Sequence, residues 1–280
     1  MSGPTAAGVG ALLLWAFLAV LTRLTAGLPP LQVTALAFLL AGLLGLAVVG
    51  ARGELRKLRQ PPLAWAHGVG GLFGYHALYF AALALAPPVE ANLLNYLWPL
   101  LIVLFSRPLL GLPLGARRLA GVALGCLGSA LLIGPAARFP AEAWLGFLCA
   151  LGCAVVWALY SVLARRLQAV PTEAVAGFCL ASALLGLAGH ALLERWVWPD
   201  PRQAVGILLL GLGPVGAAFF LWDRGMKGGD PRLLGTLAYA VPVGSTLLLV
   251  AAGHGSLDGR ILLALLLVAG GGWLAATARQ

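Results

Sequence analysis

Polar side chains follow one face of a predicted helix within residues 88–106, a stretch that is otherwise apolar. Two amides, a phenol and a proline have the spacing i, i+3, i+4 and i+7 that places them on one helical face, namely Asn92, Asn95, Tyr96 and Pro99. Because proline has no N–H to donate, the carbonyl of Asn95 would lose its helical partner in a region where water is scarce. Such groups can form hydrogen bonds with a polar solute, and they are costly against lipid. We interpret this stripe as the wall of a polar cavity within a bundle of membrane helices.

Proline also interrupts two later apolar runs, at Pro214 and Pro242. Each proline frees the carbonyl four residues earlier and therefore predicts a kink in a membrane helix. A kink of this kind can be a static feature of packing. Because Tyr96-x-x-Pro99 recurs as Tyr239-x-x-Pro242, we expect instead that the three prolines are hinges or expose backbone toward a ligand.

Aromatic residues deep in the apolar runs form a second group. Tyrosine hydroxyls in hydrocarbon need a partner, which favours inward faces, whereas Trp222 is expected at the membrane interface. Ordinary core packing is the alternative for each residue taken alone. Together these residues predict a cavity with aromatic walls, suited to flat and partly apolar solutes. The candidate cavity residues are Trp15, Tyr75, Tyr79, Asn92, Asn95, Tyr96, Trp98, Trp157, Tyr160 and Tyr239.

Ionisable side chains are scarce within the apolar runs. His76 is the candidate proton site, because an imidazole titrates near neutral pH, although burial in an apolar site would keep it neutral. Glu90 and Asp223 lie near the ends of their runs, and no acidic residue lies near the centre of one. Since carboxylates usually carry proton or sodium coupling, the sequence favours transport of a solute down its own gradient.

The sequence holds no pattern for catalysis or metal binding. Intramembrane proteases and metalloenzymes need paired aspartates, a Ser/His pair or His/Glu clusters at depth, and the four histidines are scattered along the chain. The four cysteines lie in apolar runs and are interpreted as small packing residues, without a disulfide framework. We expect neither an enzyme nor a bound metal or cofactor.

The elements that must position these side chains are membrane helices. Of the 280 residues, 61% are hydrophobic and 10% are charged, whereas about a quarter are charged in soluble proteins. Repeated apolar runs of about 20 residues predict helices that cross a bilayer, and the alternating polarity of barrel strands does not occur. The predicted spans are 6–26, 31–51, 63–86, 88–107, 116–135, 142–164, 172–194, 202–223, 231–252 and 259–278.

The basic residues predict how these spans are oriented. With the N-terminus inside, 13 of them fall in inner loops or the C-terminal tail and five fall outside. This split favours a cytoplasmic position for both termini. The net charge of +9 is then a cytoplasmic surplus, and it requires no nucleic-acid partner.

The two halves of the chain resemble each other at a spacing near 142 residues. The matched features are Trp15 and Trp157, Pro30 and Pro171, the two Tyr-x-x-Pro motifs, Arg118 and Arg260, and Gly128 and Gly270. Residues 1–137 are predicted to form one five-helix repeat and residues 138–280 a second. Because each repeat has an odd number of spans, the second would be inverted in the membrane. Inverted repeats are typical of transporters, with the substrate site between the halves.

Ten spans in two inverted halves, with Asn95-Tyr96-Leu97-Trp98-Pro99 in the fourth, resemble the drug/metabolite transporter (EamA-type) superfamily. Within it, the chain is similar to the YddG-type exporters of aromatic amino acids. The resemblance implies a basket-like fold in the bacterial inner membrane, with a central cavity lined by spans 1, 3, 4, 6, 8 and 9. Carried over by position, Asn95, Tyr96, Trp98 and Pro99 would belong to that cavity.

We therefore expect a multi-pass exporter of aromatic and other neutral amino acids, working by alternating access without ion coupling. The expected partners are the lipid bilayer and the small-molecule substrate, and the protein is expected to be a monomer. A broader metabolite or drug exporter of the same fold is the alternative among transporters. An oligomeric pore or channel is the alternative from another class.

Overall fold

The computed structural model describes residues 2–133, 138–253 and 257–278. Within these ranges ten spans are long and apolar enough to cross a membrane, and the regular secondary structure is helical. This confirms the predicted all-α membrane class. The predicted boundary after residue 137 and His254 lie outside the described residues. The spans are Gly3–Thr25, Pro30–Ala51, Pro62–Leu85, Pro88–Leu110, Ala116–Ile133, Ala141–Ala164, Thr172–Leu193, Pro201–Gly228, Pro231–Ala251 and Gly259–Thr277.

Prolines mark the starts of many of the helices. Five helices have proline as their first residue, where its missing N–H needs no helical partner. In chain order the α-helices are α1 (Gly3–Ala16), α2 (Leu18–Thr22), α3 (Pro30–Ala51), α4 (Pro62–Leu85), α5 (Pro88–Asn95), α6 (Trp98–Leu110), α7 (Ala116–Ile133), α8 (Trp144–Ala164), α9 (Val175–Leu193), α10 (Pro201–Leu212), α11 (Ala218–Gly228), α12 (Pro231–Leu237), α13 (Ala240–Ala251) and α14 (Gly259–Thr277).

Span 8 differs most from its predicted limits. It runs to Gly228, whereas the sequence predicts an end at residue 223, before the charged residues. Two charges of this extension neutralise each other: Lys227 Nζ lies 2.7 Å from Asp223 Oδ2, one turn earlier on α11. Hydropathy alone therefore places the end of span 8 too early in the sequence.

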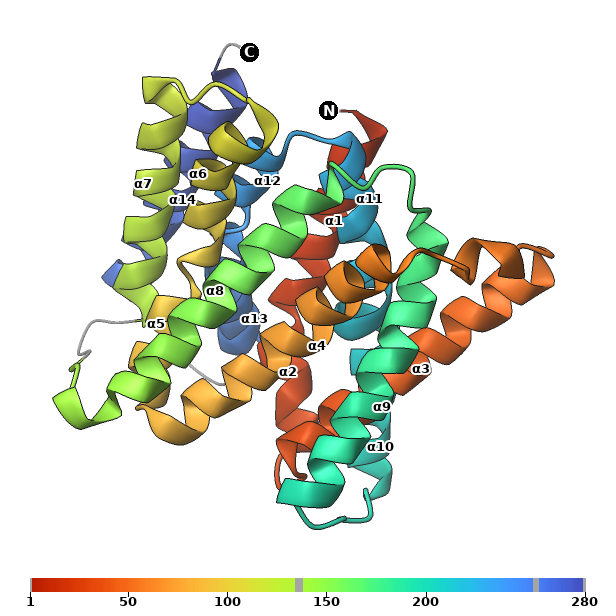
Figure 1. The fold of residues 1–280 in the computed structure, drawn as a ribbon. Coiled ribbons are helices and arrows are strands. Elements are labelled where there is room, and N and C mark those ends of the chain that lie inside the picture. Colours follow the sequence, from red (N-terminus) through yellow and green to blue (C-terminus); the bar gives the residue numbers. More distant parts are fainter. Residues whose placement is uncertain (1, 134–137, 254–256, 279–280) are drawn as a thin grey trace.

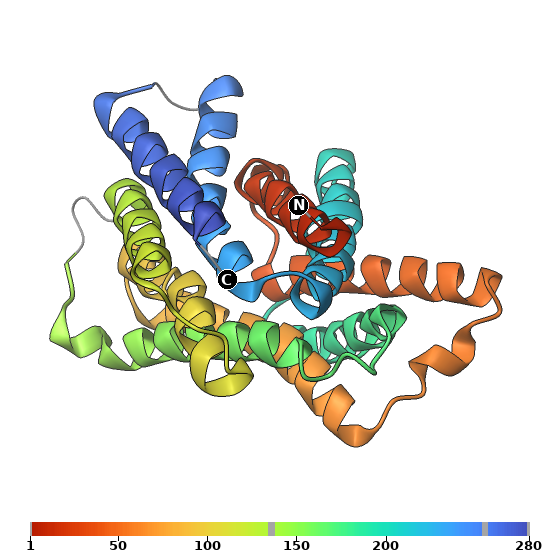
Figure 2. The same ribbon diagram turned by 90° about the horizontal axis from the view of Figure 1, so that it is seen from above.

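The helices pack mainly in pairs that join the first part of the chain to the second. The pairs are α1 with α11, α4 with α8, α3 with α9, and α7 with α14. Figure 1 shows both termini at one end of the bundle, and in Figure 2 α14 and α3 lie on opposite sides of α1. The same pairing would result if spans 1–5 were exchanged with spans 6–10, as a twofold relation between the halves requires. This pairing supports the predicted inverted repeat, which stays a prediction.

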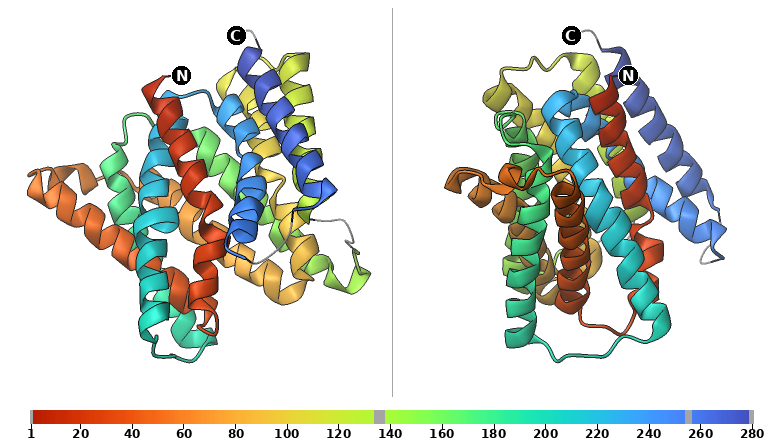
Figure 3. Two further views of the ribbon diagram at one scale, coloured as in Figure 1. Left: turned by 180° about the vertical axis from the view of Figure 1, so that it is seen from behind. Right: turned by 90° about the vertical axis from the view of Figure 1, so that its right-hand side faces the viewer.

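Glycine allows the closest of these helix pairs to form. A Cβ added to Gly121 on α7 would lie 2.6 Å from the carbonyl oxygen of Gly271 on α14, a distance that a side chain cannot occupy. The two backbones therefore touch directly, as membrane helices with small residues at their interface commonly do. The views in Figure 3 show α14 and α7 running side by side.

Four spans are interrupted within the membrane. Phe17 separates α1 from α2, and Tyr96–Leu97 and Ala238–Tyr239 separate the helices of spans 4 and 9. In span 8 a π-helical turn, Gly213–Ala217, joins α10 to α11. The predicted kinks are therefore short turns in spans 4 and 9, where Leu97 N–H donates to the Leu94 carbonyl and Tyr239 N–H to the Thr236 carbonyl, and a π-helical turn in span 8.

Candidate functional site

A cavity of about 590 Å³ lies in the middle of the bundle. Residues 25–28, which connect span 1 to α3, form part of its wall. Because this connection lies at the end of the molecule opposite both termini, the cavity extends toward that end (Figures 1 and 3). Its walls come from spans 1, 2, 3, 4, 6, 8 and 9. The set implied by the sequence resemblance omits span 2, and this is corrected: α3 begins at the wall and contributes Pro30, Val33, Thr34 and Ala37.

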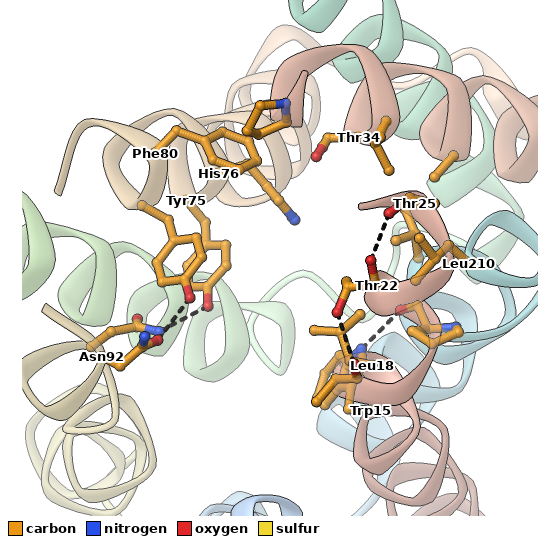
Figure 4. Close-up of a pocket in the computed structure, with 18 of the residues that line it drawn as sticks. Trp15, Leu18, Thr22, Thr25, Thr34, Tyr75, His76, Phe80, Asn92 and Leu210 are labelled. Atoms are coloured by element: carbon orange, nitrogen blue, oxygen red, sulfur yellow. Dashed lines mark hydrogen bonds between the residues drawn. The ribbon is translucent and has the colours of Figure 1, made fainter. Parts of the chain in front are cut away.

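One wall of the cavity consists of hydrogen-bonded phenols and amides (Figure 4). The Tyr79 hydroxyl donates to Oδ1 of Asn92 at 2.7 Å, and Nδ2 of Asn95 donates to the Tyr75 hydroxyl at 3.1 Å. The rings of Tyr75 and Tyr79 are stacked, with centroids 6.0 Å apart. Each phenol can still form a hydrogen bond with a ligand. The Tyr75 hydroxyl can donate its proton, and the Tyr79 hydroxyl can accept through its lone pairs.

The side chain of Asn95 is held in place from both ends. Its amide nitrogen donates to Tyr75, and its Oδ1 accepts a hydrogen bond from Sγ of Cys153 on α8 at 3.3 Å. Asn92 is held in a similar way, since its Nδ2 donates to the carbonyl of Pro88 at 2.8 Å. The polar wall is therefore preorganised, which reduces the entropy cost of binding a solute there.

The aromatic wall is built from indole rings. Trp15 contacts Trp98 and Trp157 edge-on, with ring centroids 6.4 Å and 5.6 Å away, and all three line the cavity. The indole N–H of Trp15 donates to the carbonyl of Pro214 at 2.9 Å (Figure 4). This bond joins span 1 to the π-helical turn of span 8 and satisfies a polar group that would otherwise be unpaired in the membrane.

Trp222 belongs to the same cluster, and its expected place at the membrane interface is wrong. Its side chain is 0% exposed, its ring centroid lies 5.1 Å from that of Trp15, and its N–H donates to Oγ of Ser161 at 3.0 Å. Position near the end of an apolar run suggested an interface, but span 8 extends beyond Trp222 to Gly228 and carries this ring into the core.

His76 reaches the cavity from α4 (Figure 4). Nδ1 lies 2.7 Å from the carbonyl oxygen of Leu72, so Nδ1 must carry the proton of this hydrogen bond. In the neutral ring Nε2 is then an acceptor. The ring packs edge-on against Phe38 and Tyr75, at centroid distances of 5.0 Å and 5.1 Å. Among the described residues that line the cavity none is acidic, so His76 has no carboxylate beside it there.

Tyr160 and Tyr239 do not line this cavity, which corrects the expectation from sequence. Tyr160 is 4% exposed and stacks on His67 at a centroid distance of 4.9 Å, with its ring against Gly71. Tyr239 is 0% exposed, and its ring fills the space left by Gly125 on α7. In both cases a glycine on a neighbouring helix admits the ring into the helix interface.

The three prolines also differ in position. Pro214 lines the cavity, whereas Pro99 and Pro242 are buried beside it. Pro99 is the second residue of α6, and Pro242 is the third residue of α13. Near a helix start a missing N–H costs little, so both prolines fit their breaks. Their role as hinges stays a prediction.

Several cavity residues were not predicted from the sequence. The hydroxyls come from Thr22, Thr25, Thr34 and Ser245, and additional rings come from Phe80 and Phe219. Thr22 could have been predicted, because it follows Trp15 by seven residues and so lies on the same helical face. Single threonines, serines and phenylalanines are otherwise common in membrane helices and carry little information alone.

Comparison with known proteins identifies the family. The EamA-like transporter family matches the chain twice, over residues 4–134 and 144–277. The chain belongs to this family. The aromatic amino acid exporter YddG of Ancylobacter novellus is 51% identical over 274 residues, which are 96% of each chain. A crystal structure with 51% identity superposes with a TM-score of 0.94, covering 98% of this chain and 97% of that chain.

The family assignment confirms the resemblance seen in the sequence. The two matched segments of the EamA-like family leave out residues 135–143, which include the predicted boundary between the repeats. Both the family and the Ancylobacter relative are transporters by description. The cavity just described is therefore the candidate substrate site of an EamA-like transporter.

Proposed function

We propose that this protein exports aromatic and other neutral amino acids through the central cavity by alternating access. The observation that carries the proposal is the pairing of an indole wall, Trp15, Trp98 and Trp157, with the phenol and amide wall of Tyr75 and Asn95. It is supported by the 51% identity to a protein described as an aromatic amino acid exporter. Transport rather than catalysis is the activity that this arrangement suits.

The two walls suit the two ends of an aromatic amino acid. The ring of the substrate would pack against the indoles, where edge-on and offset contacts are favourable. Its carboxylate would accept from the Tyr75 hydroxyl, and its ammonium would donate to the Tyr79 hydroxyl or to Nε2 of His76. The described lining residues include no acid, lysine or arginine, so a side chain with a net charge would stay uncompensated at low dielectric. Neutral zwitterions should therefore be preferred.

The proposed location is the bacterial inner membrane, with both termini in the cytoplasm and the protein acting as a monomer. In that orientation the cavity extends toward the outside, because it lies toward the end opposite the termini. Single cysteines at Gly53 and Leu257, in a cysteine-free background, test this orientation. The first should react with an impermeant reagent from the cytoplasmic side and the second from outside; the reverse pattern would overturn the orientation.

Transport is tested by counterflow in proteoliposomes. Liposomes loaded with unlabelled phenylalanine should take up labelled phenylalanine or tryptophan saturably, whereas labelled glutamate or lysine should enter at least about tenfold more slowly, because an uncompensated charge costs more than 1.4 kcal/mol. Uptake that rises linearly with concentration for every solute would favour a pore and overturn the carrier.

The same system tests ion coupling. We expect uptake to reach equilibration without an imposed ion gradient, and His76→Gln to leave this behaviour intact. Concentrative uptake driven by a pH gradient and abolished by His76→Gln would show that His76 is a coupling site and that the uniporter proposal is wrong.

A further inference from the structure

A second cavity, of about 500 Å³, lies at the end of the molecule that carries both termini. The charged side chains that line it among the described residues are Arg118, Arg165, Asp230 and Arg232. Three guanidinium groups and one carboxylate leave a formal excess of two positive charges. Arg118 is the second residue after the start of α7, Arg165 follows α8, and Arg232 lies in α12, so the cavity joins three separate elements.

Two of these guanidinium groups share one carboxylate oxygen. Nη1 of Arg118 and Nη2 of Arg232 both donate to Oδ2 of Asp230, each at 3.0 Å. The side chains of Arg118 and Arg232 are only 4% and 5% exposed. Burial alone would raise the pKa of Asp230, but the hydrogen bond and charge of Arg232 and the charge of Arg118 hold that pKa below its ordinary value. Asp230 is therefore ionised, and among the described residues its single negative charge serves two buried cations.

In the part of the chain that the structure describes, the remaining partners of these arginines are neutral carbonyls. Arg232 donates to the carbonyl of Pro113, Arg118 to that of Ala278, and Arg165 to that of Gly229, next to Asp230. A carbonyl satisfies an N–H group but cannot cancel a whole charge. Each guanidinium has five N–H groups, and the hydrogen bonds of the described residues use three at Arg232, two at Arg118 and one at Arg165. Donors and positive charge thus remain for an anion.

We propose that this second cavity binds a phosphate group, either free phosphate or the phosphate of an anionic lipid headgroup. A tetrahedral oxyanion has enough oxygens to accept from guanidinium groups on three elements, whereas a carboxylate has two. The bound group would neutralise the excess charge. It would also tie Arg118, in the first half of the chain, to Arg165 and Arg232 in the second. Phosphate binding would therefore stabilise the arrangement described here, in which the central cavity extends toward the opposite end.

The test measures the melting temperature of the purified protein in detergent, titrated with sodium phosphate and with sodium chloride at equal ionic strength. We expect a saturable rise with phosphate beyond that with chloride, because a ligand that binds only the folded form raises its stability. Arg118→Gln and Arg165→Gln should each weaken the apparent affinity for phosphate by about tenfold, the effect of removing one charge-assisted hydrogen bond. Arg165 is partly exposed, so its variant serves if Arg118→Gln does not fold.

Matched controls are present in the sequence itself. Arg117 and Arg166 are exposed neighbours of the two site arginines, so Arg117→Gln and Arg166→Gln remove the same charge without altering the cavity. They should leave the phosphate response unchanged. Asp230→Asn should lower the melting temperature in chloride yet tighten phosphate binding severalfold, because it removes the carboxylate that competes for the same guanidinium groups. A purely structural ion cluster would not produce this opposite pair of effects.

A titration with lipid distinguishes free phosphate from the phosphate of a lipid headgroup. Phosphatidylglycerol added to the micelles is compared with diacylglycerol, which lacks the phosphate. Stabilisation by phosphatidylglycerol that Arg165→Gln weakens would identify a lipid headgroup, and a response to inorganic phosphate alone would identify the free ion. Equal responses to phosphate and chloride without any effect of phosphatidylglycerol, or responses unchanged in both site variants, would overturn the proposal.

Discussion

The two Tyr-x-x-Pro motifs occur at corresponding breaks in spans 4 and 9, yet their tyrosines have different surroundings. Tyr96 lines the central cavity, whereas Tyr239 is fully buried against Gly125. The preceding residues also differ. Asn95 reaches Tyr75 with its amide, while Ala238 has no polar group to offer. The two motifs thus share an interruption of the helix, and the neighbouring side chains decide whether that interruption faces the central cavity or lies in a helix interface.

The largest effect should come from filling the space under Tyr239. A Cβ on Gly125 would lie 2.6 Å from Cδ2 of the Tyr239 ring, so Gly125→Ala should lower the free energy of unfolding by about 1–3 kcal/mol. Gly270, whose Cβ would meet nothing within 4 Å, is the control, and Gly270→Ala should be neutral or slightly stabilising. Melting temperatures in detergent measure both. Equal melting temperatures for the two variants would show that the Tyr239 ring does not pack tightly against Gly125.

A smaller effect separates the phenols themselves. Tyr75→Phe removes the hydroxyl that accepts from Asn95 and is free to donate to a substrate, and transport should fall by about tenfold. The Tyr239 hydroxyl has no hydrogen-bond partner among the described residues, so Tyr239→Phe should keep the wild-type rate and the wild-type stability. Counterflow of phenylalanine measures the rates. If Tyr239→Phe slowed transport as much as Tyr75→Phe, the two motifs would share a role and the comparison would fail.

Replacing the prolines of the two motifs should change the transport rate by smaller and unequal amounts. Pro99→Ala supplies an N–H that can bind the free carbonyl of Asn95, and the resulting stiffer span 4 should slow counterflow severalfold at unchanged melting temperature. Pro242→Ala, in a span whose tyrosine is fixed in a helix interface, should have less effect on the rate. A larger loss of rate in Pro242→Ala would place the moving break in span 9.

The smallest effect concerns the starts of the two spans. The side chain of Asp230 caps α12 by accepting from the N–H of Arg232 at 2.9 Å, whereas Pro87 before α5 offers no side-chain cap. Because Arg232 and Arg118 hold the pKa of Asp230 below its ordinary 3.8, its contribution to stability is present above about pH 4 and is lost as the pH falls through the folded-state pKa.

The pH dependence of a single variant tests this assignment. The difference in melting temperature between wild type and Asp230→Asn should be largest near about pH 6 and should shrink toward about pH 3. A difference that is independent of pH would mean that the charge of Asp230 does not stabilise span 9.

The sequence predicted the features that depend on local pattern. Apolar runs and boundary prolines located the ten spans, and the spacing of Asn92, Asn95 and Tyr96 placed these side chains on the face that the structure directs to the cavity. The positions of Tyr160 and Tyr239 could not be predicted from local pattern. They depend on Gly71 and Gly125, glycines on other helices that meet the rings only after the chain has folded.

The four indoles at the centre of the molecule give it an optical property. Every pair among Trp15, Trp98, Trp157 and Trp222 has a ring-centroid separation between 5.1 and 6.5 Å. At such separations the electronic transitions of neighbouring indoles couple, so the four rings contribute to circular dichroism as a group and not singly. Phenylalanine does not absorb at the red edge of the indole band. If phenylalanine binds as proposed, its arrival beside three of these rings would change the fluorescence of the cluster, and its occupancy of the cavity would be measurable without a label.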